Sequence, residues 1–161
     1  MSVISIAEFK STLLPTFPKF TRILGLDLGQ KKIGVALSDP SFQIATPFKT
    51  LHRTTFQGVV DELLTIISEE NIGALLIGLP LEMDGNEGRS CQSVRHFAYN
   101  FLKIRDIPIL FWDERLSTIA VTRTLLEADV SRTKRAGVVD KMAACFILQG
   151  FLDSQSSDTL G

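Results

Sequence analysis

Two short apolar runs separated by a polar turn dominate the first third of the chain. Residues 23–28 are almost continuously apolar, which is typical of a strand buried on both faces. Residues 33–37 repeat the pattern after a turn of glycine, glutamine and lysine, so the spacing predicts a β-hairpin. A third strand is expected over residues 42–48, where Pro47 indicates a sheet edge or a strand end.

The rest of the chain alternates between helical and extended patterns. Apolar residues at three- and four-residue spacing predict amphipathic helices, and short apolar runs predict buried strands. In chain order we expect a helix over 56–70, a strand over 74–79, a helix over 90–103, a strand over 108–112, a helix from Ser117 or Thr118 to Ala128, and a helix over 134–152. Three strands that can pair antiparallel and two crossover strands that join in parallel predict a mixed α/β sheet flanked by helices.

Both ends of the chain fall outside this pattern. Residues 1–21 precede the first strand, and Ser5 with Glu8 forms a capping box that predicts a short helix there. Residues 154–161 are small and polar, which predicts a flexible tail. We therefore expect one domain over residues 22–153 with an N-terminal extension and a C-terminal tail.

Composition restricts the possible partners. A formal net charge of -1 means that any affinity for nucleic acid must come from a local basic patch. Two distant cysteines without metal-ligand spacing favour free thiols and a cytoplasmic protein. No apolar run approaches the ~20 residues of a membrane span, and the first residues do not have the pattern of a secretory signal.

Three carboxylates stand where the predicted fold would bring them together. Asp27 interrupts the first buried strand, where an unpaired charge costs several kcal/mol. Glu114, next to Asp113, follows the fifth strand, and Asp140 shares a helix face with two alanines that permit close packing. Ligands of open α/β sheets collect at the carboxyl ends of parallel strands, so we expect these acids to converge.

Converging carboxylates repel one another unless a cation lies between them. Oxygen ligands without histidine or cysteine select Mg²⁺ or Mn²⁺, and two such ions about 4 Å apart support in-line displacement at a phosphodiester. Two plainer interpretations stay open at this point. Asp27 can act as a turn cap, and Asp113, Glu114 and Arg115 can form an ordinary polar strand end with a local ion pair.

Basic residues flank two of the three acids. One group lies in the turn after Asp27 and the other precedes the helix that carries Asp140. These residues are Lys31 and Lys32 in the turn, and Arg132, Lys134 and Arg135 before the helix. Their position predicts contacts with the phosphates of a nucleic acid, with a solvated loop as the alternative.

Four motifs occur in the order and spacing of one known family. They are residues 24–36 (LGLDLGQKKIGVA), 77–85 (IGLPLEMDG), 112–118 (WDERLST) and 138–149 (VVDKMAACFILQ). Together they resemble the YqgF/RuvX family of pre-16S rRNA nucleases, relatives of the Holliday junction resolvase RuvC with an RNase H-like fold. The resemblance covers about residues 22–153.

The resemblance implies an RNase H-like mixed five-stranded sheet and a cytoplasmic hydrolase of the two-metal-ion type. The implied activity is processing of the 5′ end of pre-16S rRNA, with Mg²⁺ or Mn²⁺ held by Asp27, Glu114 and Asp140. The implied partners are nucleic acid, either pre-rRNA or branched DNA, and ribosome assembly intermediates.

The chain departs from RuvC at the end of the fourth strand, where RuvC carries an acid and this chain has Gly78. The second metal ligand must then come from Glu114, Asp113 or Asp84, of which we prefer Glu114. Three other functions remain as alternatives: a resolvase of branched DNA, a catalytically silent nucleic-acid-binding protein, and a phosphotransferase of the actin-like superfamily. The last of these needs a second domain, for which 161 residues leave no room.

Overall fold

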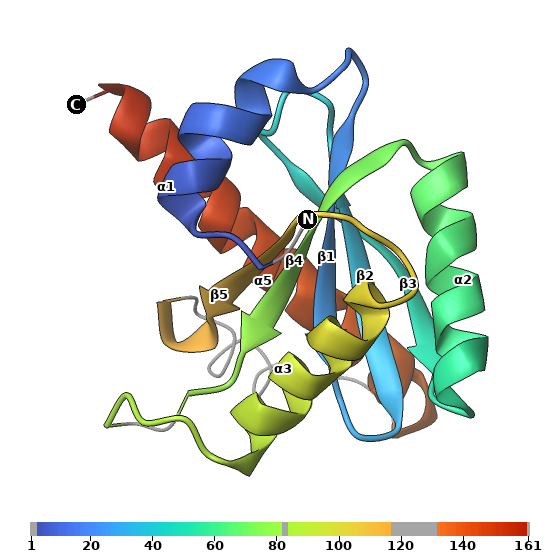
Figure 1. Cartoon of the computed structure of the whole chain (residues 1–161). Coiled ribbons are helices and arrows are strands. Elements are labelled where there is room, and N and C mark those ends of the chain that lie inside the picture. Colours follow the sequence, from blue (N-terminus) through green and yellow to red (C-terminus); the bar gives the residue numbers. More distant parts are fainter. Residues whose placement is uncertain (1–2, 82–83, 117–131, 161) are drawn as a thin grey trace.

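The protein is built around one five-stranded mixed sheet with helices on both faces (Figure 1). The computed structural model describes residues 3–81, 84–116 and 132–160. The strands are β1 Arg22–Leu28, β2 Lys32–Ser38, β3 Ala45–His52, β4 Ile72–Leu79 and β5 Ile109–Asp113, in the spatial order β3-β2-β1-β4-β5. The first three pair antiparallel, and β4 and β5 join β1 in parallel, which confirms the predicted sheet.

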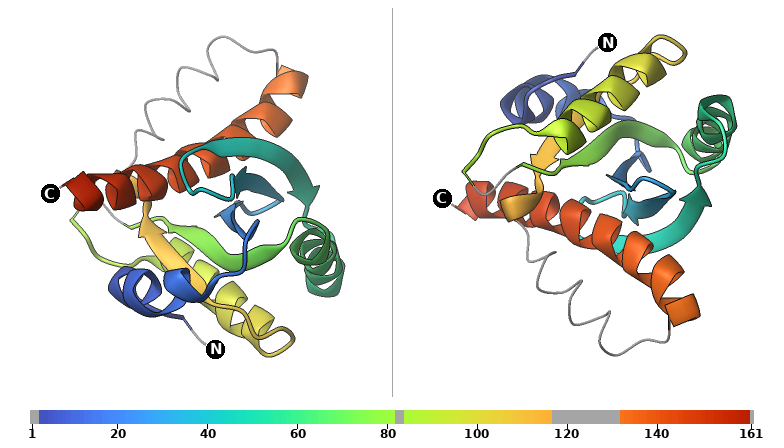
Figure 2. Two further views of the ribbon diagram at one scale, coloured as in Figure 1. Left: turned by 90° about the horizontal axis from the view of Figure 1, so that it is seen from above. Right: turned by 90° about the horizontal axis from the view of Figure 1, so that it is seen from below.

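Helices cover the two faces of the sheet unequally. Figure 2 shows α2 (Phe56–Glu69) and α3 (Arg89–Leu102) on one side and the long α5 (Arg132–Leu160) on the other. Each face has its own apolar core, because alternate residues of a strand point to opposite sides. In β1, Leu24 and Leu26 pack under α2 and α3, whereas Ile23 packs under α5.

The N-terminal extension is packed against the domain. Ser5 caps α1 (Ile6–Glu8) by accepting a hydrogen bond from the Glu8 amide at 3.1 Å, which confirms Ser5 as the N-cap. A π turn (Phe9–Leu13) and a 3-10 turn (Leu14–Thr16) follow. The Ile4 amide donates to the Ile109 carbonyl at 3.0 Å, and Phe9 is buried against α5. The extension therefore adds to the edge of the sheet at β5.

Some boundaries differ from those expected. β3 starts at Ala45, later than predicted, because the carboxylate of Asp39 accepts the Gln43 and Ile44 amides and closes a loop there. β3 is an edge strand, as Pro47 indicates, and the ladder shifts register beside Ala36, the partner of Pro47.

Two of the remaining expectations concern helices. α5 runs to Leu160, through most of the stretch predicted as a tail, and at the start of this stretch the Ser154 hydroxyl donates to the Phe151 carbonyl at 2.7 Å. The helix expected over residues 117–128 lies outside the described residues. Among the described residues, no helix is long and apolar enough to cross a membrane.

Candidate active site

The site is built at the end of the sheet where β1 and β4 finish. Asp27 is the second-last residue of β1 and is only 8% exposed. Its partner on β2 is Gly34, and its neighbour on β4 is Gly78, since the preceding residues Leu26 and Ile77 are paired. Neighbouring strands lie about 4.8 Å apart, so the Asp27 side chain stands between two glycines. Neither of these two neighbours therefore places a side chain of its own against the carboxylate.

Alternation along β1 sets the direction of the Asp27 side chain. Ile23 lies in the core under α5, and residues at even spacing from it share that face. Gly25 is the next residue on this face, and a Cβ atom there would lie 3.0 Å from Leu148 Cβ of α5. Asp27 therefore points to the side of the sheet that α5 covers.

Glu114 reaches the same side from the end of β5. It opens the 3-10 turn Glu114–Leu116, and its Oε1 lies 2.6 Å from the position that a Cβ on Gly78 would take. Gly78 is thus required for close approach, because any side chain would displace the glutamate. The Glu114 carboxylate therefore enters the space over Gly78 from the next strand, beside Asp27.

Asp113 has a different role from its neighbour. Its Oδ2 lies 2.8 Å from Arg115 Nη2, Arg115 Nε donates to both carboxylate oxygens, and the Arg115 amide donates to Oδ1 at 2.9 Å. Hydrogen bonds from the Arg115 side chain hold the pKa of Asp113 below its ordinary value, against the opposing effect of burial. The ion pair considered in the sequence analysis is therefore present at Asp113, while Glu114 turns toward Gly78.

Asp84 is engaged within its own loop. Its carboxylate accepts hydrogen bonds from the Asn86 amide at 3.0 Å and from Asn86 Nδ2 at 2.8 Å. The guanidinium of Arg115 lies 3.6 Å from a Cβ position on the adjacent Gly85, so it connects this loop to the end of β5. The structure brings Glu114 next to Gly78, and it gives Asp84 and Asp113 other partners.

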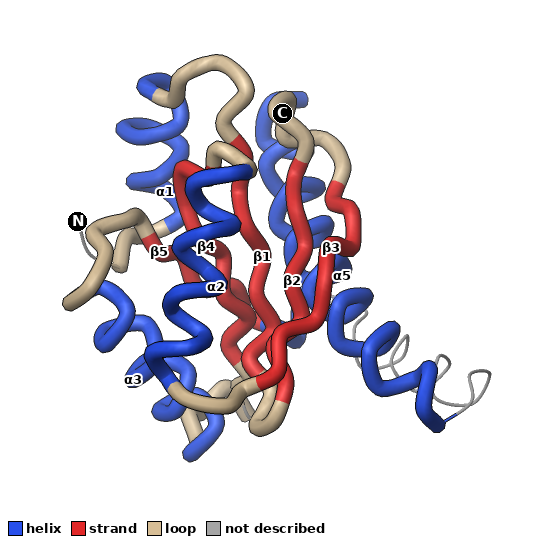
Figure 3. The backbone as a smooth tube through the Cα atoms, turned by 90° about the vertical axis from the view of Figure 1, so that its right-hand side faces the viewer, coloured by secondary structure: helices blue, strands red, loops and turns tan. Residues whose placement is uncertain are grey.

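The third predicted acid is on α5. The N-terminal end of this helix lies at the same end of the sheet as the β1–β2 turn (Figures 1 and 3). Asp140 precedes Ala144 by one turn, about 6 Å along the axis, and the Ala144 carbonyl is 3.4 Å from a Cβ position on Gly25. The side chain of Asp140 lies outside the described residues. Arg132, Lys134 and Arg135 occupy the first turns of α5, and their side chains also lie outside that description.

The turn after Asp27 is closed tightly. The Gly29 amide donates to the Lys32 carbonyl at 2.9 Å, and a Cβ on Gly29 would lie 2.7 Å from that oxygen. Lys31 at the tip is exposed, and Lys32 is half-buried at the start of β2. Both lysines therefore lie at the same end of the sheet as Asp27.

Arg53 is a residue that the sequence analysis missed. Its Nη1 donates to the Gly29 carbonyl at 2.6 Å, and its amide donates to the Lys31 carbonyl at 2.8 Å. A single arginine between a strand and a helix cap gives little sequence signal. The pairing of Lys32 with His52 is what brings residue 53 to the turn.

The chemistry of the site follows from its donors. Asp27 and Glu114 supply hard oxygen ligands at a buried strand end, which is the donor set that Mg²⁺ and Mn²⁺ prefer. Within the described side chains, no three His, Cys, Asp or Glu residues converge on one point, and Asp140 is not among those side chains. The two cysteines are buried free thiols, as predicted.

Known proteins are similar to this chain over most of its length. The RuvX family model, described as Holliday junction resolvase, matches residues 21–154. A relative from Paramagnetospirillum magneticum, named "Putative pre-16S rRNA nuclease", is 60% identical over 144 residues, 89% of this chain and 93% of its own. A protein of the same name from Rhodospirillum rubrum is 49% identical over 155 residues, 96% of this chain and 94% of its own.

Two solved structures share the fold at low sequence identity. Thermus thermophilus RuvC in complex with a Holliday junction substrate has a TM-score of 0.54 and 8% identity, covering 84% of this chain and 96% of that one. The yeast mitochondrial Holliday junction resolvase Ydc2 has a TM-score of 0.54 and 14% identity, covering 91% and 83%. The sheet is therefore RNase H-like, and, on the match over residues 21–154, the chain belongs to the RuvX family.

Proposed function

We propose that this protein is a metal-dependent nuclease that hydrolyses phosphodiester bonds, with Asp27, Glu114 and Asp140 as the acids of its active site. One observation carries the proposal: the Glu114 carboxylate lies over Gly78, on the strand next to the buried Asp27. Two acids held side by side at a strand end repel each other, and a divalent cation relieves that repulsion. Gly34, the β2 partner of Asp27, belongs to the part of the sheet that α5 covers, where Asp140 would complete the set.

The residues of the chain fit Mg²⁺ or Mn²⁺. When bound, such ions supply Lewis acidity that activates a water molecule and stabilises the leaving oxygen. Asp27 is held by its pairing with Gly34 on β2, and it directly follows Leu26, which pairs with Ile77 on β4. Glu114 is held in place by the adjacent turn, in which Arg115 pairs with Asp113. These fixed positions mean that the acids need little rearrangement to bind a cation, which raises affinity.

The proposed substrate is pre-16S rRNA, cleaved during processing of its 5′ end, and two curated relatives carry a name of that kind. A substrate of this kind belongs to the cytoplasm and to ribosome assembly intermediates. The exposed Lys31 and the basic residues before Asp140 would contact its phosphates. The second candidate substrate is a four-way DNA junction, favoured by the description of the matching family.

A cleavage assay tests the proposal. Purified protein is incubated with pre-16S rRNA or with a four-way DNA junction, in Mg²⁺, Mn²⁺ or EDTA. We expect cleavage in either metal ion and none in EDTA. Glu114→Gln should abolish cleavage, whereas Glu62→Gln, a control at an exposed acid of α2, should retain it. Cleavage that persists in EDTA, or in Glu114→Gln, would contradict the assignment.

A further inference from the structure

A cavity lies at the end of the sheet where β1 finishes, on the face opposite to Asp27 and Glu114. It has a volume of about 390 Å³ and lies between the β1–β2 turn, the start of α2 and α3. Its lining includes Gln30, Arg53, Phe56, Ser93 and Phe97. We propose that this cavity binds one unpaired nucleotide of the substrate strand, away from the nucleotide that is cleaved. The proposal rests on the nuclease function in one respect: it takes the bound strand to be the strand that the nuclease cleaves.

The charge of the cavity favours an anionic ligand. Among the described residues that line the cavity, Arg53 is the one with a charge, and none carries a carboxylate. The guanidinium is held in place by the hydrogen bond to the Gly29 carbonyl and lies over the ring of Phe97, 5.7 Å from its centroid. A preordered guanidinium of this kind binds phosphate with little loss of side-chain entropy. The hydroxyl of Ser93 and the amide of Gln30 add hydrogen-bonding groups for a sugar or a base.

The aromatic residues favour a base in addition to a phosphate. Phe56 is 39% exposed, although it is large and apolar, and it packs edge-on against Phe97 with 5.6 Å between the ring centroids. A ring exposed in this way at a cavity offers a surface for stacking, which any nucleobase can use. Only an unpaired base can reach it, because a base within a duplex is stacked on its neighbours.

The position of the cavity relates it to the acids. Arg53 binds the carbonyl of Gly29, which follows Asp27 by two residues, or roughly 7 Å of extended chain. The cavity and Asp27 therefore lie at the same end of β1, close enough for one nucleic-acid strand to contact both. A volume of 390 Å³ is within the range of about 300–1,000 Å³ typical of small-ligand pockets.

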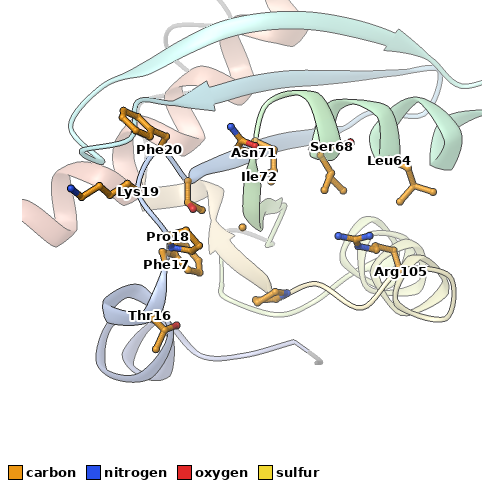
Figure 4. A pocket seen from close by; sticks show the side chains of 14 residues that line it. Thr16, Phe17, Pro18, Lys19, Phe20, Leu64, Ser68, Asn71, Ile72 and Arg105 are labelled. Carbon is orange, nitrogen blue, oxygen red and sulfur yellow. The ribbon is translucent and has the colours of Figure 1, made fainter.

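A larger groove elsewhere on the protein contains an exposed phenylalanine that serves as a control for Phe56. It has a volume of about 790 Å³ and lies at the other end of the sheet, between residues 16–21, the end of α2 and Arg105 (Figure 4). Phe20 lines this groove and is 71% exposed. It is therefore a matched exposed phenylalanine that is remote from Asp27.

The experiment measures binding without cleavage. Single-stranded oligonucleotides that carry 2-aminopurine are titrated with protein in EDTA, and both fluorescence anisotropy and quenching of the 2-aminopurine are recorded. We expect Phe56→Ala to weaken binding by about 5- to 100-fold and to remove the quenching that stacking causes. Phe56→Leu should fold with most of the packing intact and still lose the quenching. Arg53→Lys should weaken binding while keeping the charge, and Phe20→Ala should bind as the wild type does.

The outcomes separate this inference from the nuclease function. Wild-type affinity and quenching in both Phe56 variants would overturn the nucleotide pocket, and so would an equal loss in Phe20→Ala. A wild-type protein that binds no oligonucleotide would overturn it as well. Loss of binding in the Phe56 variants, together with a wild type that cleaves nothing in Mn²⁺, would support the pocket and overturn the nuclease.

Discussion

The Glu114 carboxylate fills the space that a side chain on residue 78 would need. Its Oε1 lies 2.6 Å from the position that a Cβ atom on Gly78 would take. The same position is 2.6 Å from Ile147 Cδ1. A side chain at residue 78 is therefore incompatible with both neighbours as they stand. Because Asp27 is on the adjacent strand, this glycine controls how close the two acids can come.

Gly78→Ala should impair activity more than stability. The new methyl group would displace the Glu114 carboxylate, so we expect nuclease activity to fall by about 10- to 100-fold, as when groups that orient a metal ligand are changed. Crowding at Ile147 should lower stability by about 1–3 kcal/mol. Cleavage rates and thermal midpoints of the purified variant measure the two effects.

Gly73→Ala is the matched control for that variant. It is the same substitution in the same strand, with similar crowding, since its Cβ would lie 2.5 Å from Thr21 Cγ2. Gly73 is at the other end of β4 from Gly78. We expect a comparable loss of stability with activity retained once the protein is folded. Equal loss of activity in both variants would show that Gly78 acts through folding alone.

Asp39 should make stability depend on pH. Partial burial acts to raise its pKa, but hydrogen bonds from the Ile44 amide, the Ser41 hydroxyl and the Gln43 amide lower it to about 2. An unfolded aspartate titrates near pH 3.9, so the carboxylate stabilises the fold above about pH 4 and this contribution is lost as the pH falls toward 2.

Asp39→Asn removes this contribution. We expect the free energy of unfolding to fall by about 1 kcal/mol at pH 7, a value kept small because the loop is partly solvated. The difference between wild type and variant should shrink as the pH falls from 4 to 2. Denaturant unfolding at several pH values measures it, and a difference independent of pH would contradict the assigned hydrogen bonds.

Phe9 should be essential to stability although it precedes the domain predicted from the sequence. It is 1% exposed and packs edge-on against Phe17 and Phe151, with ring centroids 5.6 and 5.9 Å apart. Phe9→Ala should therefore lower the free energy of unfolding by about 3–5 kcal/mol. Phe20→Ala, at a ring that is 71% exposed, should change it by less than about 0.5 kcal/mol.

Apolar periodicity predicted the sheet because each strand is a continuous run bounded by polar residues. The three-strand meander and the two parallel crossovers follow from run lengths and connection rules, and β1 and β4 match within two residues at each end. The limits of α5 were less predictable, because the helix continues from residue 153 to Leu160 through small polar residues, a composition that gives little helix signal.

The acids could be found from the sequence, but their division of roles could not. Asp27 is conspicuous as a charge in an apolar run. Asp113 and Glu114 are adjacent in sequence, and only the structure shows Asp113 paired with Arg115 and Glu114 turned to Gly78. Local patterns carry no information on such contacts between segments distant in sequence. For the same reason the sequence does not indicate that Arg53 contacts the β1–β2 turn, since this contact depends on the pairing of β2 with β3.

The basic residues at the start of α5 should contact phosphates. If Arg132, Lys134 and Arg135 do so, changing all three to alanine should weaken RNA binding and reduce the salt dependence of affinity by up to about three phosphate contacts. Titrations at several salt concentrations give the slope of log affinity against log salt. An unchanged slope would mean that these residues form only a solvated surface.

The substitution Asp27→Asn distinguishes two roles for Asp27, that of a metal ligand and that of a turn cap. The substitution keeps the size of the side chain and much of its hydrogen bonding, but it removes the charge that attracts a cation. We expect nuclease activity to fall by roughly 100-fold or more, with stability unchanged or higher because one acid has left a carboxylate pair. If Asp27 were only a turn cap, asparagine would serve nearly as well, and activity would be almost intact with stability altered by about 1 kcal/mol or less.

Thermal unfolding with and without Mn²⁺ completes this test. A cation that binds only the folded state stabilises it by mass action, so the wild-type midpoint should rise with Mn²⁺ concentration. The Asp27→Asn midpoint should rise little, because the charged ligand at the buried end of β1 has gone. Equal shifts in both proteins would place the cation elsewhere, and full activity in the variant would end the proposal that metal ions act at Asp27.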